Sequence, residues 1–160
     1  MNIRHATAKD LKQIAAVEAK CFNDKEAASE NSLLKRLSVF PNNFWLMFDG
    51  GTLIGFVNGM VTNISDLDDE MYENANIHDG NGKWQMIFGV CTIPDYRNKG
   101  CAGKLLKAAI SDCKAQGRKG LVLTCKKELI SFYAKFGFTD EGISKSSHGG
   151  VVWHQMRLRF

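Results

Sequence analysis

The sequence lacks several features that would place it outside the ordinary globular proteins. It has only 2 Pro among 160 residues and no repeat or low-complexity segment, which excludes collagen-like and wholly disordered chains. No apolar run approaches the roughly 18 residues that a membrane-spanning helix needs. Residues 1–10 are polar and mixed in charge, where a signal peptide has an apolar block. We therefore expect a cytoplasmic protein that does not bind membranes.

Cysteine is present without the spacing of a disulfide framework or a metal site. The cysteines number 5, an odd count, and no two of them form a Cys-x-x-Cys pair. We expect most of them to be reduced packing residues and expect no metal. They are Cys21, Cys91, Cys101, Cys113 and Cys125.

The chain has no large excess of either positive or negative charge. Lys and Arg total 21 against 17 Asp and Glu, so the net charge is only +4. The basic residues are spread along the chain rather than clustered with stacking aromatics, which makes nucleic-acid binding the weakest of the functions considered. With 44% hydrophobic residues the chain can build a real core, and its length favours one domain over residues 1–160.

Apolar spacing predicts an alternation of helices and strands. Thr7 and Asp10 have the spacing of a capping-box variant that opens the first helix. Asp49-Gly50-Gly51 predicts a tight hairpin turn, and residues 62–83, rich in Asn, Asp and Glu, predict a loop on the substrate side. The expected strands are 3–6, 44–48, 53–61, 84–92, 121–125 and 151–160, and the expected helices are 11–21, 33–37, 100–116 and 127–136.

The segment that follows strand 84–92 carries the strongest chemical signal. It runs from the Pro94-Asp95 turn into Arg97-Asn98-Lys99-Gly100-Cys101-Ala102-Gly103-Lys104, which opens a helix. The first turn of a helix presents free N–H groups and the positive end of the dipole, and small residues there leave room for an anion. Three basic side chains beside those amides suit a pyrophosphate better than a carboxylate.

Other phosphate loops do not fit this segment. It lacks G-x-x-x-x-G-K-[ST], and the chain contains no G-x-G-x-x-G. The spacing alone does not distinguish a phosphate-binding loop from the start of a helix on the surface whose basic side chains are simply solvated.

Two motifs give the chain a family resemblance. Arg97-x-x-Gly100-x-Ala102 resembles the [QR]-x-x-G-x-[GA] motif of the GNAT superfamily of acyl-CoA-dependent N-acyltransferases. Residues 129–138 resemble the family's second signature, around a tyrosine that faces the cofactor sulfur. Residues 121–138 and the aromatic-Met ending at 153–156 look most like the arylalkylamine N-acetyltransferases. The resemblance implies an α/β fold with a mixed, mostly antiparallel sheet flanked by helices and a splayed central strand.

The resemblance also implies roles for individual residues in binding acetyl-CoA. The central strand would splay at Gly89 and leave backbone groups of Val90, Cys91 and Thr92 to bind the pantetheine arm, while the 97–104 loop binds the pyrophosphate. The Val90 N–H would polarise the thioester carbonyl, and Tyr133 would protonate the departing thiolate. Tyr133 as a simple core residue is the alternative.

The general base departs from the arylalkylamine pattern. Those enzymes carry two histidines on the strand that enters the motif, and here Met86 and Phe88 stand at the matching positions. A water relay or a nearby carboxylate or histidine would have to replace them. The candidates are Asp66, Glu70, His78, His148 and His154, each of which could equally be a solvated surface group.

The resemblance to the arylalkylamine N-acetyltransferases also implies which amine accepts the acetyl group. Phe22 and Trp153 fall where arylalkylamine enzymes place rings against the substrate, with core packing as the alternative. The acidic segment 66–70 would attract a cationic amine, with a solvated loop as the alternative. The reaction expected is direct acetyl transfer from acetyl-CoA to a small primary amine, without a metal. A polyamine or protein-amine acceptor and a non-catalytic acyl-CoA sensor are the alternatives, and a homodimer is left open.

Overall fold

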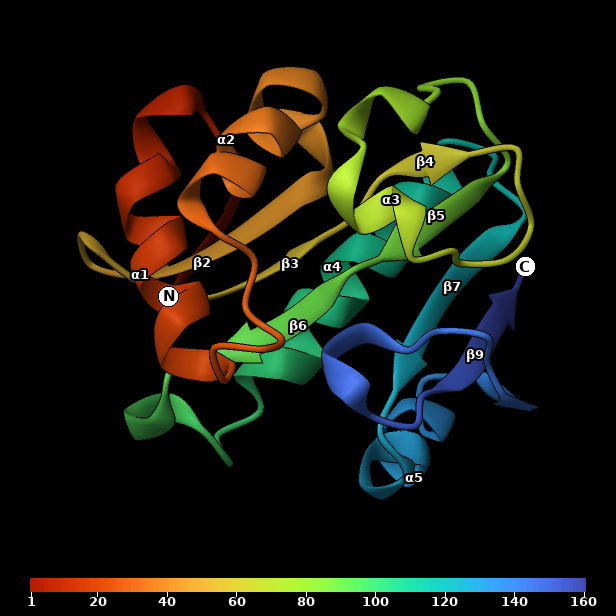
Figure 1. Ribbon diagram of the computed structural model, residues 1–160. Coiled ribbons are helices and arrows are strands. Elements are labelled where there is room, and N and C mark those ends of the chain that lie inside the picture. Colours follow the sequence, from red (N-terminus) through yellow and green to blue (C-terminus); the bar gives the residue numbers. More distant parts are fainter. The chain divides into compact units, whose positions relative to one another are not determined.

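The computed structural model describes all residues from Met1 to Phe160 (Figure 1). Contacts between Cα atoms divide the chain into two compact units. Unit 1 consists of Met1–Gly59 and Gly89–Ala109, and unit 2 consists of Met60–Phe88 and Ile110–Phe160. Each unit holds one sheet, and no helix has the length and apolar composition needed to cross a membrane. The expectation of one domain over residues 1–160 stays a prediction.

The sheet of unit 1 is antiparallel throughout, with the strand order β1-β2-β3-β6. Helices α1 (Leu11–Cys21) and α2 (Glu30–Val39) pack against each other, and α1 contacts β3 and β6 (Figure 1). Ile14 and Leu33 are fully buried in this packing. The strands are β1 (Asn2–His5), β2 (Phe44–Asp49), β3 (Thr52–Asn58) and β6 (Gly89–Thr92).

The turn between β2 and β3 confirms the predicted hairpin. Asp49 pairs with Thr52, so Gly50 and Gly51 form a two-residue connection. Gly50 has φ +60°, a left-handed value that glycine adopts at little cost.

The sheet of unit 2 is mixed, with the strand order β4-β5-β7-β9-β8. Only β5 and β7 are parallel, and the other pairs are antiparallel. Leu121, Val122 and Met86 are fully buried at its centre. The strands are β4 (Val61–Thr62), β5 (Trp84–Ile87), β7 (Gly120–Cys125), β8 (Thr139–Ile143) and β9 (His154–Arg159).

The remaining helices are short apart from α4 (Cys101–Ala115), which begins in unit 1. Gly117, with φ +74°, ends α4 as predicted. Unit 2 contains α3 (Glu70–Glu73) and α5 (Ile130–Ala134). The 3-10 turns are Ala8–Asp10, Pro41–Asn43, Ala75–Ile77, Pro94–Tyr96, Lys127–Leu129 and His148–Gly150.

Three sequence predictions are wrong in detail. The strand expected over 84–92 breaks at Phe88 into β5 and β6, which join different sheets, and the strand expected over 53–61 divides likewise into β3 and β4. The loop 62–83 contains α3. Strand β8 was not predicted, because Thr-Asp-Glu-Gly-Ile is polar and lies at the sheet edge, where no alternating apolar face is needed.

The start of α1 is fixed by a buried carboxylate. Asp10 accepts the Thr7 N–H at 2.7 Å and two hydrogen bonds from the Arg4 guanidinium at 2.8 and 2.9 Å. The Arg4 hydrogen bonds, supported by Thr7, hold the pKa of Asp10 below its usual range although burial opposes them. Asp10 therefore stabilises the fold above the carboxyl pKa of unfolded chains, about 4, and this contribution is lost as pH falls through the lower folded value.

We expect Asp10→Ala to lower the free energy of unfolding by about 1–2 kcal/mol at pH 7, because the cap and the ion pair are both lost. Asp10→Asn keeps an acceptor for Thr7 and should lose less. Urea denaturation of all three proteins between pH 7 and 3 checks this. A gap between wild type and Asp10→Asn that does not shrink in acid would contradict the role of the charge.

Candidate functional site

The predicted phosphate loop lies entirely in unit 1, between the end of β6 and the start of α4. Asn98 and Gly100 have left-handed φ values of +61° and +81°. The Lys104 N–H donates to the Gly100 carbonyl at 3.1 Å, which makes this the first helical hydrogen bond of α4. The N–H groups of Cys101, Ala102 and Gly103 consequently precede any acceptor within the helix. Such a run of backbone donors binds anions.

Positive side chains surround these donors. Arg97, Lys99 and Lys104 are exposed. Arg97 donates one hydrogen bond from Nε to the Thr92 carbonyl at 3.0 Å, which fixes the guanidinium. Lys99 Nζ lies 5.5 Å from the centroid of the Tyr96 ring. Arg97 is therefore fixed in position, as an anion site requires, and the binding of an anion by this loop stays a prediction.

The Tyr96 hydroxyl ties this loop to the β2–β3 hairpin. It donates to Asp49 at 2.6 Å. This hydrogen bond raises the pKa of Tyr96, so the hydroxyl stays protonated and remains a donor at neutral pH.

One side of strand β6 has no neighbouring strand in its sheet. Ile93 N–H donates to Ile54 at 2.9 Å, and alternation then directs the Gly89 and Cys91 backbone groups toward β3. The N–H and C=O groups of Val90 and Thr92 point to the opposite, unpaired side. Arg97 binds the Thr92 carbonyl. The backbone N–H and C=O of Val90 and the N–H of Thr92 therefore face the unpaired edge of the strand.

Two further observations concern this strand. The Thr92 hydroxyl is buried and has no hydrogen-bond partner in the protein, as expected of a strand that serves a polar ligand. Position 89 has room for a side chain, because a Cβ added to Gly89 would lie 3.5 Å from the Phe22 ring, an ordinary contact distance. Phe22 follows α1 and is half-buried against β6.

Tyr133, the predicted general acid, lies in α5 of unit 2. Its side chain is only 7% exposed. Edge-on contacts surround it, with ring centroids 5.1 Å from Phe132 and 5.9 Å from Phe138. This packing fixes the ring orientation, as both a core residue and a positioned acid require. Unit 1 holds Val90 and unit 2 holds Tyr133, so their cooperation stays a prediction.

Trp153 belongs to a partly exposed set of rings in unit 2, here termed the aromatic cluster: Tyr72, Phe88, His148 and Trp153. Tyr72 stacks on His148 with centroids 4.9 Å apart and an interplanar angle of 16°. The Trp153 indole N–H donates to the His148 carbonyl at 2.7 Å, and the Tyr72 hydroxyl lies 3.3 Å from the Thr124 hydroxyl. Sequence reasoning found Trp153 but missed Tyr72, because the members come from distant segments.

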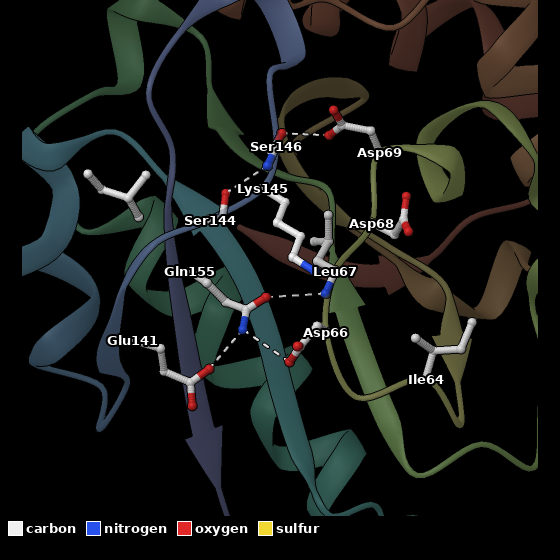
Figure 2. Close-up of a pocket in the computed structure, with 11 residues that line it drawn as sticks. Ile64, Asp66, Leu67, Asp68, Asp69, Glu141, Ser144, Lys145, Ser146 and Gln155 are labelled. Atoms are coloured by element: carbon white, nitrogen blue, oxygen red, sulfur yellow. Dashed lines mark hydrogen bonds between the residues drawn. The ribbon is translucent and has the colours of Figure 1, made fainter.

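A pocket of about 410 Å³ lies in unit 2 (Figure 2). Asp69 fixes one of its walls, since it accepts hydrogen bonds from the Ser146 hydroxyl at 2.5 Å and the Ser147 N–H at 3.0 Å. The residues that line it are Ile64, Asp66, Leu67, Asp68, Asp69, Glu141, Ile143, Ser144, Lys145, Ser146 and Gln155.

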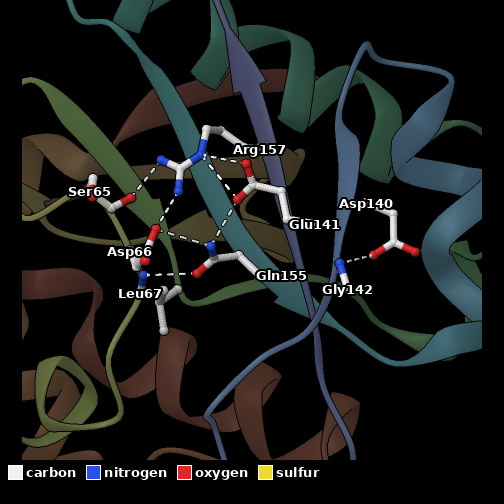
Figure 3. Close-up of polar contacts among 8 residues, drawn as sticks. All are labelled: Ser65, Asp66, Leu67, Asp140, Glu141, Gly142, Gln155 and Arg157. Atoms are coloured by element: carbon white, nitrogen blue, oxygen red, sulfur yellow. Dashed lines mark hydrogen bonds and ion pairs between the residues drawn. The ribbon is translucent and has the colours of Figure 1, made fainter.

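Arg157 pairs with two of the four carboxylates that line this pocket (Figure 3). Arg157 is only 5% exposed and pairs with Asp66 at 2.5 Å and with Glu141 at 3.0 Å. Desolvation alone would raise the pKa of Glu141, but hydrogen bonds from Arg157 and Gln155 outweigh it and lower the value. Asp66 is thereby a structural anchor and a poor candidate for the general base.

The other base candidates differ in their surroundings. His78 Nδ1 accepts the Val61 N–H at 3.0 Å, and burial followed by the Arg118 charge lowers its pKa. His154 lies 3.3 Å from Asp140, and Glu70 is exposed on α3. His148 is the candidate that belongs to the aromatic cluster. No group of three or more His, Cys, Asp or Glu side chains is arranged to hold a metal ion.

A family model described as the acetyltransferase (GNAT) domain matches residues 2–140. The chain belongs to the GNAT acetyltransferase family. The α/β fold, with its mostly antiparallel strands and flanking helices, is the fold of that family. No curated protein sequence matches the chain.

Solved structures of GNAT proteins are similar over nearly the full length. A GNAT-like decarboxylase, GphF, in complex with isobutyryl-CoA is 19% identical, with a TM-score of 0.86 and 99% of each chain covered. The PaiA N-acetyltransferase of Thermoplasma acidophilum in complex with coenzyme A is 20% identical, with a TM-score of 0.73 and coverage of 99% and 98%. The ribosomal-protein-S18-alanine N-acetyltransferase of Escherichia coli is 16% identical, with a TM-score of 0.75 and coverage of 99% and 92%.

We expect Arg157→Met to lower the free energy of unfolding by about 2 kcal/mol at pH 7, because two carboxylates lose their buried partner. Arg159→Met is the matched control, since Arg159 also lies over Trp84, at 5.3 Å, but is exposed. Its effect should be below about 0.5 kcal/mol. Thermal and urea unfolding check both variants, and equal losses would contradict a special role for Arg157.

Proposed function

We propose that this protein is an N-acetyltransferase that transfers the acetyl group of acetyl-CoA directly to a small primary amine. The observation that carries the proposal is the 97–104 loop, where left-handed residues, three basic side chains and the start of α4 form one anion site next to β6. This chemistry suits the pyrophosphate of CoA. The matching family and the CoA complexes of its relatives support the same ligand.

The unpaired side of β6 is the proposed site of the pantetheine arm. Val90 and Thr92 offer donors and an acceptor there, and the orphan Thr92 hydroxyl offers one more group. An amide-bearing arm laid along them would pair as an added strand. We assign the pyrophosphate to Arg97, the backbone of residues 98–103 and Lys104, and the arm to the backbone of Val90, Cys91 and Thr92.

The proposed chemistry is a direct attack of the amine nitrogen on the thioester carbonyl carbon. The Val90 N–H stabilises the negative charge that develops on the carbonyl oxygen. The C–S bond then breaks, and Tyr133 donates its phenolic proton to the departing thiolate. No activated nucleophile of the protein is needed for this route.

His148 is the residue we propose as the general base. An ammonium must lose a proton before it can attack, and an imidazole serves this purpose near neutral pH. Stacking on Tyr72 and the adjacent Trp153 would place His148 beside a bound aromatic amine. In this proposal His148 takes the role of the two histidines of the arylalkylamine enzymes, whose positions are occupied here by Met86 and Phe88.

The aromatic cluster favours an arylalkylamine acceptor over a polyamine. Partly exposed rings bind another ring by stacking or edge contacts. Phe22, which lies beside β6 in unit 1, keeps the acceptor role that the family resemblance alone implies. The acidic pocket supports a polyamine less well, because Arg157 already pairs with two of its carboxylates. A protein amine and a non-catalytic acyl-CoA sensor are the competing functions.

Turnover of acetyl-CoA on an amine panel tests the proposal. The panel contains arylalkylamines, polyamines and a lysine peptide, with product detected by mass so that protein thiols do not interfere. Tyr133→Phe should lower kcat at least about tenfold on the accepted class. Binding of acetyl-CoA without any turnover would favour the sensor. Release of carbon dioxide from a carboxyacyl-CoA without an acceptor would instead favour a decarboxylase, the activity for which GphF is named.

Arg97→Gln should raise the KM for acetyl-CoA about tenfold or more and change kcat little, since a charge-assisted hydrogen bond to phosphate contributes about 1.5–3 kcal/mol. Arg159→Gln is the matched control and should leave both constants unchanged. Steady-state kinetics with acetyl-CoA varied at saturating amine provides the comparison. An unaltered KM in Arg97→Gln would contradict the assignment of Arg97 to the pyrophosphate of the cofactor.

His148→Ala should lower kcat/KM for the amine about tenfold at pH 7. The deficit should shrink toward pH 10, where free amine becomes abundant without a base. His154→Ala, whose histidine pairs with Asp140, is the control and should keep wild-type activity throughout. If the His148 deficit is constant across pH, the residue shapes the acceptor site and the base lies elsewhere.

A further inference from the structure

A second cavity of unit 2 adjoins the aromatic cluster. It has a volume of about 580 Å³ and is here termed the lysine cavity, lined by residues 126–128, 143, 151, 152 and 154. Its apolar part consists mainly of Ile143 and Val152, both of which are more than half exposed. Lys126 belongs to both features, because it lines the cavity while its Nζ lies 5.9 Å from the centroid of the Trp153 ring.

The charge of the lysine cavity is positive. Lys126 and Lys127 outnumber Glu128, the one carboxylate in the lining. His154 also lines the cavity, and Asp140, 3.3 Å away, matches its charge whenever the imidazole is protonated. This balance contrasts with the pocket of Figure 2, which four carboxylates line. The lysine cavity therefore favours an anionic group rather than a cationic one.

Lys126 and His148 lie beside the same indole ring. The His148 and Trp153 ring centroids are 6.1 Å apart, and the Trp153 indole N–H donates to the His148 carbonyl at 2.7 Å. The aromatic cluster thus has the proposed general base and a cation next to one ring. When an acceptor ring is held there with its amine toward His148, the other substituents of the amine-bearing carbon are within reach of the long lysine stem.

A positive charge at this place discriminates between acceptors. A plain arylalkylamine is itself a cation, and a second ammonium repels it. An α-amino acid carries its amine and a carboxylate on one carbon, and that carboxylate accepts a charge-assisted hydrogen bond from a lysine. Lys126 is half-buried, so the interaction is screened less than at an exposed lysine.

We propose that the acceptor is an aromatic amino acid whose ring lies in the aromatic cluster and whose α-carboxylate is bound by Lys126. The inference rests on the proposed acetyl transfer and narrows its acceptor to arylalkylamines with a carboxylate on the amine-bearing carbon. The ammonium first loses a proton to His148. The nitrogen then forms the C–N bond, the C–S bond breaks, and Tyr133 protonates the thiolate. The second proton that leaves the nitrogen restores the phenol, so the products are the N-acetyl amino acid, CoA and one proton.

Three acceptors that differ only at the amine-bearing carbon test the inference: phenylalanine, phenylalaninamide and phenethylamine. Each is assayed with acetyl-CoA and the full-length protein, and the product is detected by mass. In Lys126→Met, kcat/KM for phenylalanine should fall at least about tenfold, because a charge-assisted hydrogen bond is lost. The values for the other two acceptors should not fall more than about twofold. The ratio of phenylalanine to phenylalaninamide, compared between wild type and variant, cancels the different basicities of the amines.

Two further variants are the controls. Lys135→Met removes an exposed lysine at the end of α5, outside the lysine cavity, and should leave all three values unchanged. Lys126→Arg keeps the positive charge and should retain most of the preference for phenylalanine. In the wild type, 3-phenylpropanoate should inhibit the acetylation of phenylalanine at least about tenfold more strongly than 3-phenylpropanamide does. This inhibition decides the role of the carboxylate even if Lys126→Met fails to fold.

The outcomes separate this inference from the proposed function. If phenethylamine is acetylated and Lys126→Met does not lower the ratio of phenylalanine to phenylalaninamide, the inference is overturned and the acetyl transfer stands. Equal losses for all three acceptors in Lys126→Met would likewise overturn it, since the charge would then not select the carboxylate. If the wild type acetylates none of the three acceptors, the proposed arylalkylamine function fails, and the inference fails with it.

Discussion

The first turn of an α-helix carries N–H groups that the helix itself cannot bond, and the ligand binding that we propose for unit 1 depends on where α4 places them. The left-handed backbone at Asn98 and Gly100 turns the chain directly from the end of β6 into α4. A single loop therefore connects the unpaired edge of β6 to the free N–H groups at the start of α4. A single ligand with both a phosphate group and an amide arm fits this arrangement better than an isolated anion.

Arg97 connects these features physically. Its Nε donates to the Thr92 carbonyl at the end of β6, and its guanidinium also interacts with the Cys21 thiol at the end of α1. We propose that the same side chain binds the pyrophosphate of CoA. The Tyr96–Asp49 hydrogen bond holds the loop from its other side.

The sequence predicts those parts of the fold that local interactions determine. Helix α4, its glycine end, the β2–β3 turn and the capping of α1 follow from short-range spacing, and the structure confirms them. The break of strand 84–92 does not follow, because β5 joins β7 and β6 joins β3, and these partners are far apart in sequence. Strand β8 and the aromatic cluster depend equally on distant segments. The cooperation of Val90 with Tyr133 stays a prediction from the family resemblance.

Titration of labelled protein with acetyl-CoA, followed through backbone amide resonances, tests whether residues 97–104 and β6 bind the cofactor. We expect saturable shifts at Cys101, Ala102 and Gly103, whose N–H groups would bind the phosphates, and at Val90 and Thr92 on the unpaired side of β6. Amides of Gly89 and Cys91, which point to β3, should shift less than those of their neighbours. Saturable binding that leaves the amides of residues 101–103 and Val90 unchanged would contradict this assignment.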